Sequence, residues 1–188
     1  MTDIEAQRNL QPELGRSERL LWAGRPGQGI LFRPSDIFLI PFSLMWGGFA
    51  IFWETAVITM GAPFFFMLWG IPFVLVGLHL IFGRFIFDAW ARSRTWYGVS
   101  NERILIRAGG ISSRLTTLNL ASLSEVSMTE KSDGRGTLTL GPAAPAGFNI
   151  QKRGWPGAGS NQSPSFEAIG NARQVLDVIR DAQKRLSD

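Results

Sequence analysis

The chain contains no cysteine and only one histidine, His79. The absence of cysteine excludes a disulfide scaffold, a cysteine-ligated zinc site and a cysteine nucleophile. The sequence also lacks the phosphate-binding glycine loop that ends in Lys-Ser/Thr, and it lacks the G-x-S-x-G motif of serine hydrolases. Its carboxylates form no evident pair for acid–base chemistry. We therefore expect a protein that is not an enzyme and that uses no cofactor and no metal.

Charge is nearly absent from one long block of the sequence. Between residues 36 and 87 the ionisable side chains are those of Asp36, Glu54, His79 and Arg84. All other charges lie before or after this block, whereas a soluble protein of 188 residues distributes charge through its helices and turns. The net charge is +4, and the basic residues flank the apolar block instead of lining one helix. This pattern favours contact with anionic lipid over nucleic-acid binding, and we expect no nucleic-acid partner.

Two uncharged segments inside this block are long enough to cross a membrane. Residues 37–53 form a helix of about 26 Å, slightly shorter than a hydrocarbon core of ~30 Å, and residues up to 60 can extend it. Residues 62–83 span such a core without extension. For either segment alone, the core helix of a soluble protein is the alternative interpretation. Two consecutive segments of this kind predict transmembrane helices over residues 35–60 and 61–87, joined as a hairpin.

Arginines on both sides of the hairpin predict its orientation. Five arginines precede the first segment, five lie between residues 84 and 107, and the link over residues 54–62 contains neither Lys nor Arg. By the positive-inside rule, both termini lie in the cytoplasm and the protein crosses the cell (inner) membrane twice. The first 34 residues contain no apolar core of signal-peptide length, so we expect residues 1–34 to remain as a cytoplasmic N-terminal segment.

The polar residues inside the apolar block are functional candidates, because burial of an ionisable group in lipid is costly. In a hairpin, Glu54 lies near the outer surface and His79 a turn or two from the inner one, so the two cannot form a proton relay. We expect Glu54 at the membrane interface, and His79 facing the partner helix or extending toward the inner surface. Asp36 and Arg84 lie at similar depth on the cytoplasmic side, which predicts an ion pair.

After residue 94 the sequence takes the pattern of short strands separated by turns. Strands are predicted over residues 95–100, 103–107, 114–120, 123–130, 136–140 and, more briefly, 148–150. The last element is predicted as an amphipathic helix from about Pro164 to Leu186, with Ser163 or Ser165 as its cap. Such a meander closes as a small barrel or sandwich, and the apolar face of the helix covers it.

Five segments contain further motifs, each of them short. In chain order they are Glu18–Pro26 (E-x-[LV]-L-W-x-G-x-P), Tyr97–Ile106 (opening Y-x-[VL]-[TS]-N-x-R-[IL]), Leu120–Val126 (L-x-x-I-x-x-V, with Leu123 at the Ile position), Asp133–Thr137 (D-G-x-G-T) and Phe166–Ile169 (F-x-x-I). Their order and spacing resemble the bacterial pleckstrin-homology-like (PH-like) membrane protein family, in which many members place two membrane helices before the domain. The resemblance implies an α+β PH-like domain over residues 94–188. That domain would be a strongly bent β-barrel of about seven strands, capped by the C-terminal helix, with no catalytic activity.

The sequence thus predicts a non-enzymatic integral membrane protein that presents an interaction or scaffold domain at the cytoplasmic membrane face. The domain would bind an unidentified protein partner or lipid headgroups through basic residues, namely Arg107, Arg114, Lys131, Arg135, Lys152 and Arg153. Solvated charges on a small domain are the plainer interpretation of these residues. The alternative function is an oligomeric subunit of a membrane pore or transporter, a homo-oligomer in which Glu54 and His79 supply the polar groups.

Overall fold

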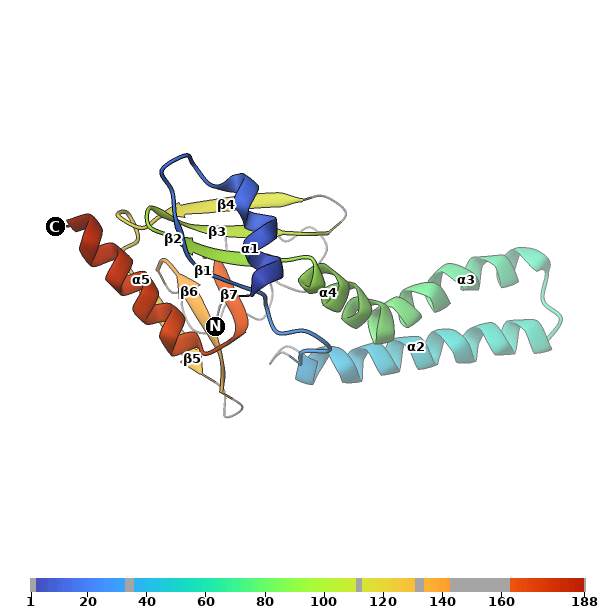
Figure 1. Ribbon diagram of the computed structural model, residues 1–188. Coiled ribbons are helices and arrows are strands. Elements are labelled where there is room, and N and C mark those ends of the chain that lie inside the picture. Colours follow the sequence, from blue (N-terminus) through green and yellow to red (C-terminus); the bar gives the residue numbers. More distant parts are fainter. Residues whose placement is uncertain (1–2, 33–35, 111–112, 131–133, 143–162, 188) are drawn as a thin grey trace. The chain divides into compact units, whose positions relative to one another are not determined.

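The computed structural model describes residues 3–32, 36–110, 113–130, 134–142 and 163–187 (Figure 1). The chain divides into two compact units. One unit is the segment Ile30–Ala89, and the other combines Met1–Gly29 with Trp90–Asp188. The second unit is therefore built from two parts of the sequence, and the first unit is inserted between them.

The inserted unit is a helical hairpin. Helix α2 (Asp36–Thr59) ends at a tight turn, in which Gly61 adopts a positive φ of 64°. The return helix runs without a break through α3 (Phe64–Leu78), the π-helical turn η2 (His79–Gly83) and α4 (Arg84–Ser93). Both helical runs are long and apolar enough to cross a membrane. The second run continues past residue 87, where the sequence predicted its end, because α4 contains neither Gly nor Pro.

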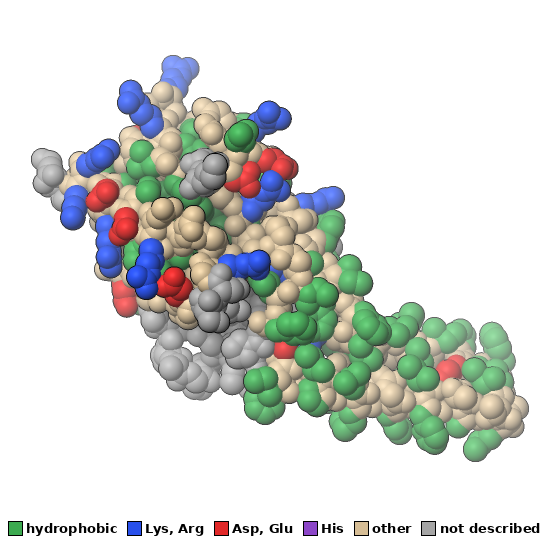
Figure 2. All heavy atoms as spheres, turned by 60° about the horizontal axis from the view of Figure 1, so that its bottom comes forward, with side chains coloured by type: hydrophobic (Ala, Val, Ile, Leu, Met, Phe, Trp, Pro, Cys, Tyr) green, Lys and Arg blue, Asp and Glu red, His purple; other side chains and the backbone are tan. Residues whose placement is uncertain are grey.

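Close packing between the two helices depends on glycine. A Cβ atom added at Gly77 of α3 would lie 2.8 Å from the Cα atom of Gly47 on α2, so the two backbones touch there. The large side chains point outward: Phe38, Phe52 and Phe64 are 69%, 71% and 75% exposed. Figure 2 shows hydrophobic side chains, in green, along the hairpin.

The predicted ion pair at the open end of the hairpin is confirmed. The Nη1 atom of Arg84 donates to Oδ1 of Asp36 at 2.8 Å, and Asp36 is buried. The pair joins the first turn of α2 to the first turn of α4, and thus fixes the two helices in register.

The second unit contains two antiparallel sheets. In the first, β1 (Leu20–Gly24), β2 (Trp96–Ser100), β3 (Arg103–Ala108) and β4 (Arg114–Asn119) are adjacent in that order. In the second, the order is β5 (Val126–Glu130), β6 (Arg135–Leu140) and β7 (Ser165–Gly170). The described residues therefore contain seven strands, as expected. They do not form the expected closed barrel, because no strand pairing joins the two sheets in the described part of the chain.

The N-terminal residues belong to the domain, whereas the sequence predicted residues 1–34 as a separate segment and a domain boundary at residue 94. Trp22 pairs with Val99 and Gly24 with Tyr97, which makes β1 the edge strand of the first sheet. Helix α1 (Ile4–Leu10), followed by the 3-10 turn η1 (Gln11–Glu13), packs on the same sheet: Leu10 is buried with Leu105. The hairpin is thus inserted between the first two strands of the domain.

The C-terminal element begins later than predicted. Residues 165–170 form strand β7, and helix α5 spans Ala172–Ser187. Phe166 and Ile169 are three residues apart, which is also the spacing of one helical turn. In the structure both side chains are buried, because a β-bulge in β7 interrupts the alternation of side chains between the two faces of the strand. Phe166 pairs with Leu138 while Ile169 pairs with Gly136, so β7 contains one extra residue between these pairs.

Helix α5 covers the core of the domain, as its sequence predicted. Its buried residues Val175, Leu176 and Ile179 lie in one cluster with Phe166 and Tyr97. The stacked rings of Tyr97 and Phe166, with centroids 4.6 Å apart, join the first sheet to the second. Side-chain packing, rather than a continuous β-ladder, therefore holds the two sheets together.

Candidate functional site

A buried charge network of the domain centres on Glu18. Its carboxylate accepts hydrogen bonds from Ser100 Oγ (2.6 Å), from Arg103 Nη2 (2.9 Å) and from the backbone N–H of Gly15 (2.8 Å). Burial alone would raise the pKa of Glu18, but these hydrogen bonds outweigh it and lower the pKa to about 2. Glu18 is therefore a permanent anion that joins the N-terminal segment to β2 and β3, and it is too weak a base for proton transfer near neutral pH.

A second ion pair attaches α1 to the end of β1. Asp3 caps α1 by accepting from the backbone N–H groups of Glu5 and Ala6, and it also accepts from Arg25 Nε at 2.8 Å. The hydrogen bond from Arg25 lowers the pKa of Asp3 below its usual value. The ion pair between Asp3 and Arg25 thus stabilises the fold.

Arg107, one of the predicted binding residues, makes several contacts inside the fold. It is half-buried and donates from Nη1 to the backbone carbonyl of Asn9 at 2.7 Å. The same nitrogen lies 3.7 Å from a carboxylate oxygen of Glu13, and the guanidinium lies 5.9 Å from the ring centroid of Trp96. Arg107 thus holds the end of α1 against the outer face of the first sheet.

The other predicted basic residues do not share a face with Arg107. In the register of β3 and β4, Arg107 lies opposite Leu115 while Ala108 lies opposite Arg114. Because successive side chains alternate between faces, Arg107 and Arg114 lie on opposite faces of the sheet. Arg114 is exposed at the start of β4, and Arg135 is exposed at the start of β6 in the other sheet. The predicted residues Lys131, Lys152 and Arg153 lie outside the described residues.

Arg92, which sequence reasoning counted only as a flanking charge, holds the two chain connections to the hairpin together. It is buried, and its guanidinium donates to the backbone carbonyls of Gly27 (2.6 Å) and Gly29 (2.7 Å). Residues 27 and 29 lead out of β1, and Arg92 lies shortly before β2. Both connections therefore leave the domain side by side, at the edge where β1 ends and β2 begins.

This edge also contains Gly109, which follows β3. A Cβ atom at Gly109 would lie 2.1 Å from the backbone oxygen of Arg94, so Gly109 is in close contact with residue 94. The guanidinium of Arg94 lies 4.6 Å from the ring centroid of Trp90. We call this end of the domain the connection edge, and define it by Gly27–Gly29, Trp90–Arg94, Gly109 and Arg114.

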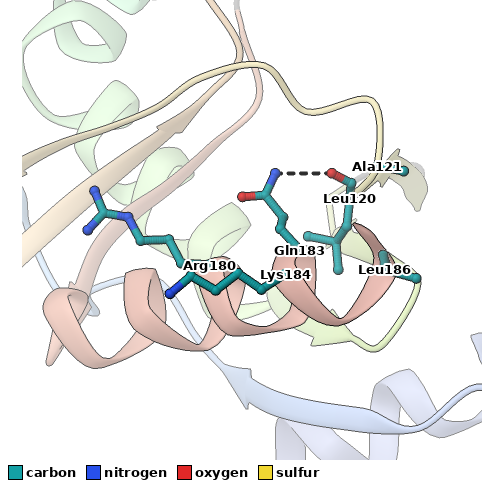
Figure 3. A pocket seen from close by; sticks show the side chains of 6 residues that line it. All are labelled: Leu120, Ala121, Arg180, Gln183, Lys184 and Leu186. Atoms are coloured by element: carbon teal, nitrogen blue, oxygen red, sulfur yellow. Dashed lines mark hydrogen bonds between the residues drawn. The ribbon is translucent and has the colours of Figure 1, made fainter. Parts of the chain in front are cut away.

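An open hollow of about 540 Å³ lies at the opposite end of β4 (Figure 3). It is lined by Leu120, Ala121, Arg180, Gln183, Lys184 and Leu186. Gln183 donates from Nε2 to the backbone carbonyls of Leu120 (3.1 Å) and Leu123 (3.0 Å), which fastens the end of α5 to the loop after β4. Six residues of extended chain separate Leu120 from Arg114, roughly 20 Å, so the hollow is remote from the connection edge.

The two polar residues of the hairpin lie apart, as predicted. A Cβ atom at Gly70 would lie 1.6 Å from Oε2 of Glu54, so this carboxylate packs against the glycine of the facing helix. His79 is exposed, and its ring lies beside Gly83, one turn further along its own helix. Since Gly70 and His79 are nine residues apart, about 13 Å along a helix, the structure places no relay between Glu54 and His79.

In the described residues, no group of three or more His, Asp or Glu side chains is arranged to hold a metal ion. The arrangement observed defines a class: a two-sheet antiparallel domain with a C-terminal helix, interrupted after its first strand by a hairpin of apolar helices.

Comparison with known proteins gives one structural likeness. No family model and no curated protein matches the chain. Among solved structures, the chain is similar to a crystal structure of a DUF1696 family protein with a pleckstrin-homology domain from Shewanella loihica PV-4. The match has a TM-score of 0.42 and 11% sequence identity, and it covers 95% of this chain and 91% of that chain.

Proposed function

We propose that this protein anchors a non-enzymatic, PH-like interaction domain to the cytoplasmic face of the cell membrane through its helical hairpin. The main support is the exposure of the hairpin's apolar side chains. Phe49, Phe52, Phe65 and Trp69 are 66%, 71%, 65% and 58% exposed. A water-soluble protein rarely exposes so many large apolar groups together, whereas a bilayer covers them without cost.

The insertion point of the hairpin supports the anchoring role. Because both connections leave the domain at one edge, a membrane hairpin holds the whole domain on one side of the bilayer. The arginines that flank the hairpin, and the lack of Lys and Arg in its short loop, favour the cytoplasmic side for this domain.

A binding role fits the use of the domain's polar groups. Glu18, Ser100 and Arg103 are engaged in bonds that hold the fold, and so are Asp3 and Arg25. The described part of the domain also carries exposed basic side chains, among them Arg114 and Arg135. The function we propose is therefore the binding of a protein partner or of lipid headgroups at the membrane surface.

The alternative of a pore subunit finds less support in the geometry. Glu54 packs against Gly70 inside a single hairpin, and His79 lies at another depth beside Gly83. A polar path through several copies would need polar groups that line one continuous surface.

Membrane extraction and site-directed labelling test the proposal. The full chain should stay in the membrane fraction after washes with high salt and alkaline carbonate. Because the chain has no cysteine, a single Met60→Cys variant can be labelled without background. We expect this thiol to react with an impermeant reagent from outside the cell, and tags at both ends of the chain to react only after permeabilisation. Release by carbonate, or tags on opposite faces, would refute the anchoring role.

A further inference from the structure

We infer that the free edge of strand β4 is a docking site for an extended segment of a partner protein, which adds to the first sheet as a further strand. The inference deepens the proposed function and rests on its partner-binding role, because it names the surface and the class of partner. The partner segment is defined by its chemistry: an extended peptide that carries an acidic residue opposite Arg114.

The hydrogen bonds between β3 and β4 determine which backbone groups of β4 point away from the sheet. Strand β4 lies at the margin of the first sheet and pairs with β3 on one side only (Figure 1). The N–H of Leu120 donates to the carbonyl of Glu102 at 3.1 Å, which continues the register of these strands by one residue. Hydrogen-bonded pairs alternate in an antiparallel ladder, so Leu118 and Thr116 also bond to β3. The residues between them direct their N–H and C=O groups toward the free edge.

The outward-directed backbone groups of Leu115 and Thr117 have no hydrogen-bond partner in the described part of the chain. These residues are two positions apart, about 7 Å along a strand, and an antiparallel strand exchanges its pairs of hydrogen bonds at this spacing. Asn119 comes next in the alternation, and its carbonyl already accepts from the N–H of Ser122 at 3.3 Å. The edge therefore offers two donors and two acceptors in the geometry that a further strand requires.

The other strands at the margins of the two sheets carry features that protect a free edge. Strand β1 has a register shift between Leu20 and Trp22, and the pairing of β6 with β7 is shifted as well. Strand β5 ends at Glu130, which accepts from Arg173 Nε at 2.9 Å, and α5 packs against this strand. Strand β4 pairs with β3 without a shift and contains neither Gly nor Pro. Of the four described margins, the edge of β4 is thus the one best suited to accept a strand.

The side chains of β4 suit a cross-strand partner. On the outer face, Leu115 is 41% exposed and Thr117 is exposed as well. On the inner face, Leu118 packs against the main core and fixes the strand in place. Apolar and β-branched side chains of this kind form stabilising pairs with the residues of a neighbouring strand.

The charge of Arg114 favours a different chain over a second copy of this one. Arg114 is exposed and makes no ion pair in the described part of the chain. An acidic residue directly opposite it would form a favourable cross-strand pair. Antiparallel pairing of two β4 strands would instead place Thr116, Leu118 or a second Arg114 opposite it, because pairing preserves the alternation of residues. None of these residues is acidic.

The test uses the full chain in detergent micelles and a fluorescent synthetic peptide of about ten residues. The peptide alternates Val with Thr and carries one Glu near its C-terminus, which lies opposite Arg114 in an antiparallel pairing. We expect the peptide to slow hydrogen exchange of the Leu115 and Thr117 amides, as measured by nuclear magnetic resonance. The amides of Thr116 and Leu118 already bond to β3 and should keep their exchange rates.

Two variants and a modified peptide test the role of the free edge. Thr117→Pro removes one outward N–H at a position where an edge strand tolerates proline, and Thr117→Val is the matched control that keeps this N–H. We expect Thr117→Pro to weaken peptide binding about tenfold, as for the loss of one hydrogen bond, and Thr117→Val to bind like the unchanged protein. A peptide methylated at the backbone nitrogens that face β4 should not bind, and this result does not depend on the folding of any variant. Arg114→Glu should weaken binding of the Glu peptide and strengthen binding of a peptide with Lys in its place.

Three results would overturn the inference. The first is equal binding of the methylated and unmethylated peptides. The second is exchange protection over Val126–Glu130 in place of Leu115 and Thr117, which would assign docking to β5. The third is protection of the β4 amides that rises with protein concentration when no peptide is present, which would assign the edge to a second copy. A chain that resists carbonate extraction but shows no peptide-dependent protection refutes this inference and leaves the anchoring role intact.

Discussion

At the scale of single residues, the buried charge of Glu18 stabilises the fold of this domain. The carboxylate of Glu18 is enclosed by donors from three parts of the chain. Glu18 belongs to one of the sequence motifs, but its role could not be predicted. Its partners Ser100 and Arg103 are more than 80 residues away in the sequence. By contrast, the pair Asp36–Arg84 could be predicted, since a hairpin brings residues of equal depth together whatever their separation in sequence.

The lowered pKa of Glu18 predicts a pH-dependent contribution to stability. Its pKa falls from the ordinary 4.5 to about 2 in the folded protein, so between these values the unfolded chain binds more protons than the native one. The stabilisation is therefore complete above about pH 4.5 and is lost as the pH falls toward 2. At about 1.4 kcal/mol per pKa unit, it amounts to at most about 3.5 kcal/mol.

The variant Glu18→Gln measures this contribution. The difference in free energy of unfolding between the unchanged protein and the variant should be largest above pH 4.5 and should shrink as the pH is lowered. Denaturant titrations in detergent at several pH values give this difference. Glu102→Gln removes a neighbouring exposed carboxylate and is the control. A constant difference across the pH range would contradict the assignment.

At the scale of elements, the hairpin depends on close contact between two glycines. Gly77→Ala should lower the thermal unfolding midpoint of the hairpin, since the added Cβ atom would lie 2.8 Å from the backbone of Gly47 and would force the helices apart. Gly48→Ala is a matched control on α2, because its added Cβ atom meets nothing within 4 Å. We expect a loss of about 1–2 kcal/mol for Gly77→Ala, of the order of other packing defects.

Detergent-solubilised protein allows the two glycine variants to be compared directly by thermal unfolding of the helical circular dichroism signal. Gly48→Ala should be neutral or slightly stabilising, because alanine favours the helix. If both variants unfold at the same temperature, the contact at Gly77 does not determine the packing of the hairpin.

Strands β7 and β1 of the domain escaped prediction for different reasons. Strand β7 resembled a helix start because its bulge places Phe166 and Ile169, three residues apart, on the same buried side. Periodicity is a weak guide in a strand interrupted in this way. Strand β1 has too few residues for a clear pattern, and its partner β2 lies beyond the whole hairpin.

At the scale of the whole molecule, the domain is discontinuous in sequence but compact in space. This predicts that the hairpin can be removed without loss of the fold. A chain in which residues 30–89 are replaced by a short Gly/Ser linker should be monodisperse without detergent and should unfold cooperatively, because Arg92 and the pairing of β1 with β2 already hold the two ends together.

Residues 94–188 alone are the informative comparison. This segment lacks β1 and α1, so Leu105 loses its cover and β2 becomes an edge strand. We expect it to aggregate or to lack a cooperative transition, as measured by size-exclusion chromatography and near-ultraviolet circular dichroism. Equal stability of this shorter chain would mean that β1 and α1 are dispensable.

The sequence by itself determined what depends on local composition: two long apolar helices joined by a short turn, the ion pair Asp36–Arg84, the five strands between residues 95 and 140, and the amphipathic face of the last helix. These features follow from hydrophobic periodicity and from charge, which neighbouring residues display directly. Only the tertiary structure decided that residues 1–29 complete the domain, that Arg107 and Arg114 face opposite ways, and that Arg92 joins the two connections. Each of these depends on contacts between segments that are distant in sequence or on strand register, and such contacts leave no local pattern in the chain.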